Sequence, residues 1–121
     1  MEQLDARLLR IFIGESDVYE GRALYQAIVE LLRRDGLAGA TVLRGIAGFG
    51  MSSRLHTAHI LRLSEDLPIV VECVDTTEKI EAVLPELERM IGDGLITLEK
   101  IDVRLYRAND DTFPGRDSNS D

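Results

Sequence analysis

The segment Gly36–Gly50, GLAGATVLRGIAGFG, constrains the fold of this chain more than any other. It combines a helix stop, a short apolar strand and a glycine-rich turn. Glycine is used where φ is positive or where the backbone must come close to another group. Gly45, Gly48 and Gly50 stand where a strand normally carries side chains, and a strand gives up that packing area where a bend or a close partner needs room. We therefore predict that residues 45–56 form the functional zone.

Composition limits the class of protein. The chain has 121 residues, enough for one domain, and a net charge of −8. Such a charge argues against general affinity for nucleic acid, because neutralising phosphates requires a basic surface. No apolar run is long enough for a membrane helix, and the first ten residues lack the apolar core of a secretory signal. The single cysteine, Cys73, excludes an internal disulfide. We expect a cytoplasmic protein that neither binds nucleic acid nor inserts directly into a membrane.

The first part of the chain predicts a strand followed by an amphipathic helix. Ala6–Ile13 is a compact apolar run that ends at Gly14, which is typical of a buried strand. Asp17, with Glu20 three residues later, resembles a helix-start box. Gly36 is then placed to end the helix. The apolar stripe at helical spacing consists of Leu24, Ala27, Ile28, Leu31 and Leu32.

Two further strands and a second helix are predicted downstream. Ala40–Ala47 has the pattern of a strand, and His59–Leu63 that of another, which Pro68–Val74 continues or replaces. Asp75 and Glu78 again have the spacing of a helix start. The second apolar stripe consists of Ile80, Val83, Leu84 and Leu87.

The last strand changes the parity of its apolar positions. Apolar residues alternate in one parity up to Leu98 and in the other from Ile101 onwards. One face cannot hold both sets, so we predict a bulge or break near Glu99–Lys100. Residues 108–121 are polar and acidic, which predicts a disordered tail after a folded domain of residues 1–107.

The order strand, helix, strand, strand, helix, strand is that of the ferredoxin-like fold of the α+β class. In this βαββαβ arrangement, two helices pack on one face of a four-stranded antiparallel sheet. The other face stays bare, and the strands supply more apolar side chains than two helices can cover. Association buries such a face, so we expect a homotrimer or another closed ring.

The runs GLAGATV, GFG and IGDG resemble the PII nitrogen-regulatory signalling proteins. A closer resemblance, to a bacterial PII-like family of unknown function, is carried by IFIGESD, GLAGATVLRGIAGFG, HTAHILRLSEDLP and VVECVD, and it covers about residues 7–106. PII proteins are trimers that bind adenine nucleotides between subunits and signal through a protruding loop. The resemblance therefore implies a non-enzymatic regulatory protein that modulates a partner protein, such as a membrane transporter or channel.

The resemblance also implies a ligand cleft between subunits. Thr41, Gly48 and Gly50 match the PII positions that line one wall of the cleft. Gly92 and Gly94 match the PII glycines whose backbone approaches the phosphates. A small anionic effector, with an adenine nucleotide as the candidate, would bind there and order the loop Met51–Thr57. The residues that this cleft would use are Thr41, Gly48, Phe49, Gly50, Arg54, Gly92 and Gly94.

Two departures from the PII pattern bear on the effector. Leu95 stands where PII proteins carry a lysine that grips phosphate, and Arg104 and Arg107 are spaced differently from the two arginines that PII proteins place at the end of the last strand. Losing such a lysine removes a charge-assisted contact worth roughly 1.5–3 kcal/mol. This departure argues against ATP binding in the PII manner and leaves open a nucleotide with fewer phosphates or another small anion.

Two alternatives stay open. His56 and His59 could bind a metal in a trimer if Thr57–Ala58 turns, with Glu72 or Asp75 completing the site, although residues three apart on a strand point to opposite faces. A structural interaction scaffold is the other alternative. An enzyme is not predicted, because no nucleophile, base and oxyanion site come together in the sequence.

Overall fold

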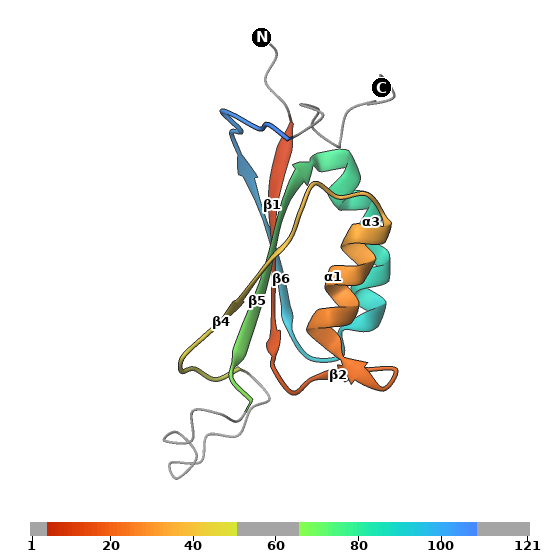
Figure 1. The fold of residues 1–121 in the computed structure, drawn as a ribbon, viewed down its shortest axis with the longest axis vertical. Coiled ribbons are helices and arrows are strands. Elements are labelled where there is room, and N and C mark those ends of the chain that lie inside the picture. Colours follow the sequence, from red (N-terminus) through yellow and green to blue (C-terminus); the bar gives the residue numbers. More distant parts are fainter. Residues whose placement is uncertain (1–4, 51–65, 109–121) are drawn as a thin grey trace.

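The computed structural model describes residues 5–50 and 66–108, which form one sheet with two helices packed against it (Figure 1). Its elements are β1 (Ala6–Gly14), β2 (Val18–Tyr19), β3 (Arg22–Ala23), α1 (Leu24–Arg34), β4 (Thr41–Arg44), β5 (Pro68–Thr76), α3 (Thr77–Met90) and β6 (Leu95–Ile101). Apart from the short β2–β3 hairpin, their order is the predicted βαββαβ. The ferredoxin-like α+β class is confirmed.

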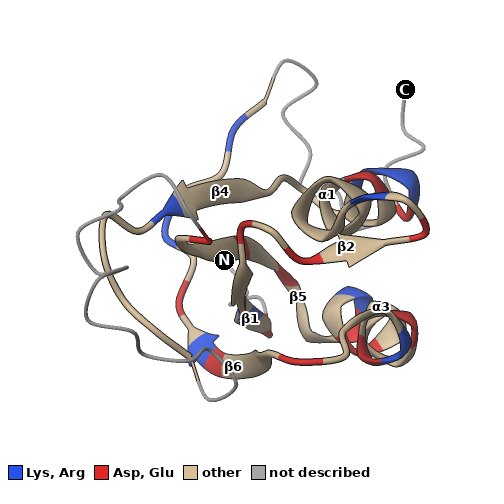
Figure 2. Cartoon of the chain, turned by 90° about the horizontal axis from the view of Figure 1, so that it is seen from below, with Lys and Arg blue, Asp and Glu red and all other residues tan. Residues whose placement is uncertain are grey.

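The four long strands form an antiparallel sheet in the order β4-β5-β1-β6. Both helices lie on one side of it, as Figure 2 shows from below. Alternate residues of the two central strands point into the layer between sheet and helices, as the two-residue period of a strand requires. The core contains Leu9, Ile11, Val71, Cys73, Ile28, Leu32, Ile80, Val83 and Leu87, which include most of the two predicted stripes.

The predicted start of α1 at Asp17 is wrong. The helix begins at Leu24 after Ala23, which makes no side-chain cap, because the β2–β3 hairpin comes between β1 and α1. Asp17 instead closes the turn that follows β1. Its Oδ2 accepts a hydrogen bond from the Gly14 amide at 2.9 Å, and its carbonyl oxygen accepts one from the Leu24 amide at 2.8 Å. Gly36 follows the helix with a φ of +79°, as predicted.

The predicted start of the second helix at Asp75 is wrong by one residue. The cap of α3 is Thr76, whose side chain accepts a hydrogen bond from the Lys79 amide at 3.3 Å. Asp75 is completely buried, and its carboxylate accepts hydrogen bonds from the amides of Ala38 at 2.8 Å and Thr76 at 2.7 Å. Asp75 therefore ties the segment before β4 to the end of β5.

No bulge interrupts β6, so the prediction of a break near Glu99–Lys100 is also wrong. The pairing with β1 is continuous from Leu95 opposite Phe12 to Ile101 opposite Ala6. Both faces of this strand carry apolar residues: Ile96 and Leu98 lie opposite the core residues Ile11 and Leu9, whereas Leu95 and Ile101 lie on the other face.

The strand predicted at Ala40–Ala47 is shorter, at Thr41–Arg44, and β5 confirms Pro68–Val74 with two more residues. The strand predicted at His59–Leu63 lies outside the described residues, as does most of the predicted tail.

The face of the sheet away from the helices is lined mainly by apolar side chains. We call it the open face. Arg10 lies near its centre and forms ion pairs with Glu72 of β5 at 2.9 Å and Glu99 of β6 at 3.5 Å. Around this group lie Leu8, Phe12, Leu43, Val70, Val74 and Leu95, of which Leu43 and Leu95 are about half exposed.

Candidate functional site

The two glycine segments predicted to line the cleft lie at the same end of the sheet but at opposite edges. The first, residues 45–50, follows β4, and the second, residues 92–94, precedes β6. Arg44 pairs with Ile69, which pairs with Ile13, and Leu95 pairs with Phe12, so both segments lie at the lower end in Figure 1. Because β5 and β1 separate the two edges, the two glycine segments do not meet within one chain.

The first segment packs its glycines against a proline. A Cβ atom built on Gly45 would lie 2.9 Å from Cγ of Pro68, and one built on Gly48 would also lie 2.9 Å from the same atom. Real Cβ atoms do not come this close, so the Pro68 ring explains both glycines. Phe49, between Gly48 and Gly50, is 72% exposed. Thr41 is exposed on β4, opposite Glu72 of the open face.

Gly92 and Gly94 differ in their surroundings. A Cβ on Gly94 would lie 2.8 Å from the carbonyl oxygen of Phe12 and 2.9 Å from Cγ2 of Ile91, whereas one on Gly92 would meet no atom within 4 Å. Gly94 therefore serves the packing of the turn against β1. Gly92 leaves backbone open to an incoming group, which is what a phosphate-binding turn needs.

Alanine substitutions should separate these two roles. We expect Gly94→Ala to lower the free energy of unfolding by about 2 kcal/mol, because the backbone of Phe12 must shift to admit the methyl group. Gly92→Ala is the matched control, and its stability should change by less than about 0.5 kcal/mol. Urea denaturation of both variants checks this. Equal losses of stability in the two variants would contradict the assignment.

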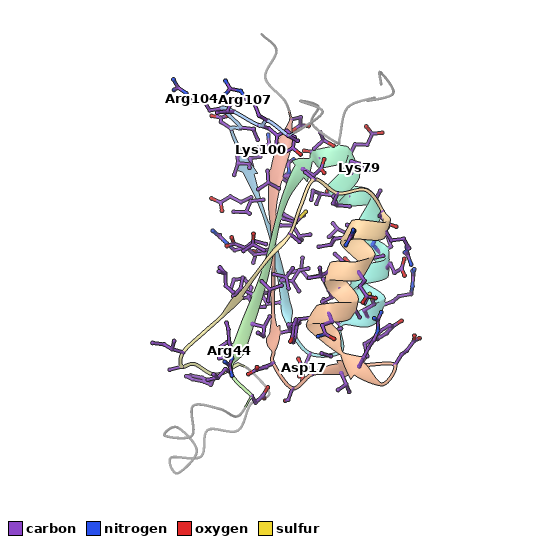
Figure 3. All side chains as sticks on the ribbon, viewed as in Figure 1. Asp17, Arg44, Lys79, Lys100, Arg104 and Arg107 are labelled. Atoms are coloured by element: carbon purple, nitrogen blue, oxygen red, sulfur yellow. The ribbon has the colours of Figure 1, made fainter. Side chains whose placement is uncertain are left out.

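The residues that depart from the PII sequence pattern lie at opposite ends of β6. Leu95, the position of the missing lysine, is 56% exposed on the open face. Arg104 and Arg107 lie beyond the other end of β6, near Lys100 (Figure 3). Seven strand residues at about 3.3 Å each separate them from the glycine turn of the same chain. Within one chain these arginines therefore do not reach that turn.

A polar cluster at the lower end joins segments that are far apart in the sequence. Arg44 donates to Oε1 of Glu15 at 3.1 Å, and the amide and hydroxyl of Ser16 both donate to Oδ1 of Asp66, at 3.1 and 2.8 Å. Sequence reasoning misses this cluster because its partners are 29 and 50 residues apart. The cluster ties Arg44 at the end of β4 and Asp66 just before β5 to the turn that follows β1. Arg44 is a half-exposed cation beside the first glycine segment.

Cys73 is buried in β5 on the side of the helices. Burial, with a smaller contribution from the charge of Asp75, raises the pKa of its thiol to about 12. The thiol is therefore protonated at neutral pH and is a poor nucleophile.

A prediction follows for the reactivity of this cysteine. In the native protein at pH 8, we expect Cys73 to react with a disulfide reagent such as dithionitrobenzoate at least about 100-fold more slowly than in urea, because only the thiolate attacks and the side chain is inaccessible. Absorbance at fixed reagent concentration measures both rates. Fast reaction of the folded chain would show that this strand opens readily.

The metal hypothesis gains no support from the described residues. Within 5–50 and 66–108, no group of three histidine, cysteine, aspartate or glutamate residues could hold a metal ion. Glu72 is engaged by Arg10, and the Asp75 carboxylate is engaged by backbone amides. His56 and His59 lie outside the described residues, as does Arg54 of the predicted cleft, so these assignments stay predictions. No helix in the described ranges is long and apolar enough to cross a membrane.

Comparison with known proteins identifies the family. Residues 6–103 match the model of the family DUF190, described as "Uncharacterized ACR, COG1993". The chain belongs to this family. It is 40% identical over 105 residues to the UPF0166 protein MJ1524 of Methanocaldococcus jannaschii, covering 86% of this chain and 94% of the relative. It is also 40% identical over 103 residues to a UPF0166 protein of Aquifex aeolicus, covering 85% and 97%.

Solved structures share the fold at low sequence identity. A putative PII-like signalling protein from Thermus thermophilus superposes with a TM-score of 0.58 at 19% identity, covering 85% of this chain and 93% of that one. CPII from Thiomonas intermedia, bound to ADP, AMP and acetate, gives 0.55 at 18% identity, covering 85% and 92%. The divalent ion tolerance protein CutA1 from Ehrlichia chaffeensis gives 0.55 at 11% identity, covering 85% of each chain. The predicted resemblance to PII-like proteins is confirmed.

Proposed function

We propose that this chain is a PII-like regulatory protein that binds a small anionic effector, foremost an adenine nucleotide, in clefts between the subunits of a homotrimer. The observation that carries the proposal is the position of the two glycine segments. They lie at one end of the sheet but at opposite edges, so the β4 edge of one subunit facing the β6 edge of the next would complete a cleft.

The open face supports association of copies of the chain. It presents Leu43 and Leu95 to solvent at 48% and 56% exposure, beside the half-buried Phe12 and Val70. Apolar surface of this kind is favourable to bury, at roughly 25 cal/mol per Å². The ion pairs of Arg10 at the centre give this face a polar feature that can fix the register of association.

The site favours an effector with few phosphates. Gly92 offers accessible backbone, and Arg44 is a half-exposed cation near the other glycine segment. The PII lysine position is occupied by Leu95, which cannot neutralise a third phosphate. Relatives of the fold support the choice, because CPII is described bound to ADP with AMP or with bicarbonate. By analogy with PII proteins, the bound effector would change affinity for a partner protein such as a membrane transporter or channel, without catalysis.

The proposal is tested by thermal denaturation against AMP, ADP, ATP, a cyclic nucleotide, bicarbonate and divalent metals. A ligand at 100 times its dissociation constant adds about 2.7 kcal/mol, so we expect AMP or ADP to raise the melting temperature by about 4 °C or more. Gly92→Ala should weaken this response and leave the unliganded melting temperature unchanged.

Three outcomes would contradict the proposal. A response to metal alone would favour the histidine site, and no response to any ligand would favour an interaction scaffold. An undiminished nucleotide response in Gly92→Ala would show that the cleft lies elsewhere. Equilibrium sedimentation of the same samples reports separately whether the trimer forms.

A further inference from the structure

A pocket of about 450 Å³ lies in the helix layer, on the side of the sheet opposite to the open face. Its lining comes from the β2–β3 hairpin, α1 and α3. Figure 2 shows β2 next to the two helices. Three apolar side chains from its lining, Ala27, Leu31 and Met90, also belong to the buried core, and Tyr19 adds an aromatic ring. The pocket is therefore separate from the proposed effector cleft.

The charges around this pocket do not balance. Its lining includes two guanidinium groups and three carboxylates. Arg22 is paired with Glu30, and Arg34 is paired with Glu86 at 3.1 Å. In the ranges 5–50 and 66–108, the carboxylate of Glu20 forms no hydrogen bond or ion pair. Glu20 is exposed at the rim of the pocket, so one negative charge without a partner faces a pocket that also contains apolar side chains.

Turn chemistry does not account for Glu20. Tyr19 and Arg22 pair across a two-residue turn in which Glu20 has a φ of +50° and Gly21 a φ of +84°. Positive φ at both positions defines a type I′ turn, which strongly prefers asparagine, aspartate or glycine at the first position. Glutamate has no short side chain that could stabilise this conformation locally. Its presence costs stability in this turn, and local preferences of this kind are broken mainly at functional or strained sites.

We propose that this pocket binds an alkyl cation, that is, an ammonium or guanidinium group on an apolar stem. The stem would lie along the partly buried Tyr19 side chain, next to the edges of Leu31 and Met90, and the cationic head would pair with Glu20. Long cationic side chains bind in this way, with the stem on apolar surface and the charge at a polar rim. The Tyr19 ring adds a further attraction for a cation. Lysine or arginine of a partner polypeptide has this chemistry, and so does a free alkylamine.

The test is an NMR titration of the full chain at constant ionic strength. The probes are Nα-acetyl-lysine methylamide, its neutral isostere Nα-acetyl-norleucine methylamide, and n-butylammonium chloride. We expect saturable shifts of the Gly21, Arg22 and Leu31 amides with the lysine derivative, at a dissociation constant of about 1–10 mM, and much smaller shifts with the norleucine derivative. Equal binding by n-butylammonium would assign the site to free amines, and weaker binding would assign it to polypeptide lysine.

Three variants make the result decisive. Glu20→Gln should weaken binding about tenfold, because it removes the unpaired charge, whereas Glu78→Gln, an exposed glutamate of α3 outside the pocket, should not change it. Glu20→Asn should weaken binding by the same factor. It should also raise the melting temperature by about 3 °C, because Asn-Gly is a preferred type I′ turn pair. A loss of binding in this stabilised variant could not be explained by a folding defect. Absence of saturable shifts up to about 20 mM, equal binding of the neutral isostere, or full binding by both Glu20 variants would overturn the proposal.

Discussion

Asp75→Ala is expected to lower the free energy of unfolding by about 3 kcal/mol. The Asp75 side chain is completely buried and accepts hydrogen bonds from the amides of Ala38 and Thr76. Alanine would leave both amides without an acceptor in a site closed to water, and an unsatisfied buried donor costs about 1–3 kcal/mol. Urea denaturation followed by circular dichroism measures the change.

The matched variants are Asp75→Asn and Glu78→Ala. Asparagine keeps one acceptor oxygen at nearly the same volume, so it should lose less stability than alanine. Glu78 is exposed, so its removal should cost less than about 0.5 kcal/mol. Ala38 lies three residues before Thr41, and the alanine variant should therefore also weaken effector binding at the β4 wall. A loss as small as that of Glu78→Ala would show that Asp75 does not hold this segment.

Leu43→Asp is expected to convert the proposed trimer into monomers. Leu43 is 48% exposed on β4, beside Val70 of the open face. Association would bury the new carboxylate among apolar side chains, at a cost on the order of 2–4 kcal/mol per chain. Three such positions in one assembly raise the dissociation constant by several orders of magnitude. Sedimentation equilibrium at micromolar concentrations measures the result.

Val18→Asp is the control for this experiment. Val18 is 70% exposed, more than Leu43, but it lies in the β2–β3 hairpin rather than on the open face. An aspartate there should leave association unchanged. If Leu43→Asp stays associated, or if both variants dissociate, the open face is not the interface. The far-ultraviolet circular dichroism of each variant confirms that the monomer is folded.

The periodic parts of the fold could be predicted from sequence because their signals are local. The apolar stripe from Leu24 to Leu32 and the compact apolar run Ala6–Ile13 each depend on residues close together in the sequence, and both predicted elements are present as α1 and β1. The predicted helix starts were wrong because two acidic residues three positions apart occur in turns as well as at the beginning of a helix. Asp17 closes a turn, and a hairpin too short to show a strand pattern comes before the helix.

The candidate site was harder to predict because its reasons are tertiary. The sequence marks Gly45, Gly48 and Gly94 as unusual, but it does not show that the Pro68 ring and the Phe12 carbonyl oxygen occupy the space beside them. These contacts account for three glycines by packing, whereas a Cβ on Gly92 would meet no atom within 4 Å. The pairing of Arg44 with Glu15 is equally invisible until β1 and β4 are placed in one sheet.

The location of the glycine segments at opposite edges of the sheet has a consequence for stoichiometry. Each chain would contribute one half of a site at its β4 edge and one half at its β6 edge. A closed ring then has as many complete sites as subunits, whereas an open row of chains has one complete site fewer than it has subunits. Effector would then favour ring closure, since it binds only where two chains meet. Its apparent affinity should fall on dilution, and the protein would respond jointly to the concentration of its effector and to its own abundance.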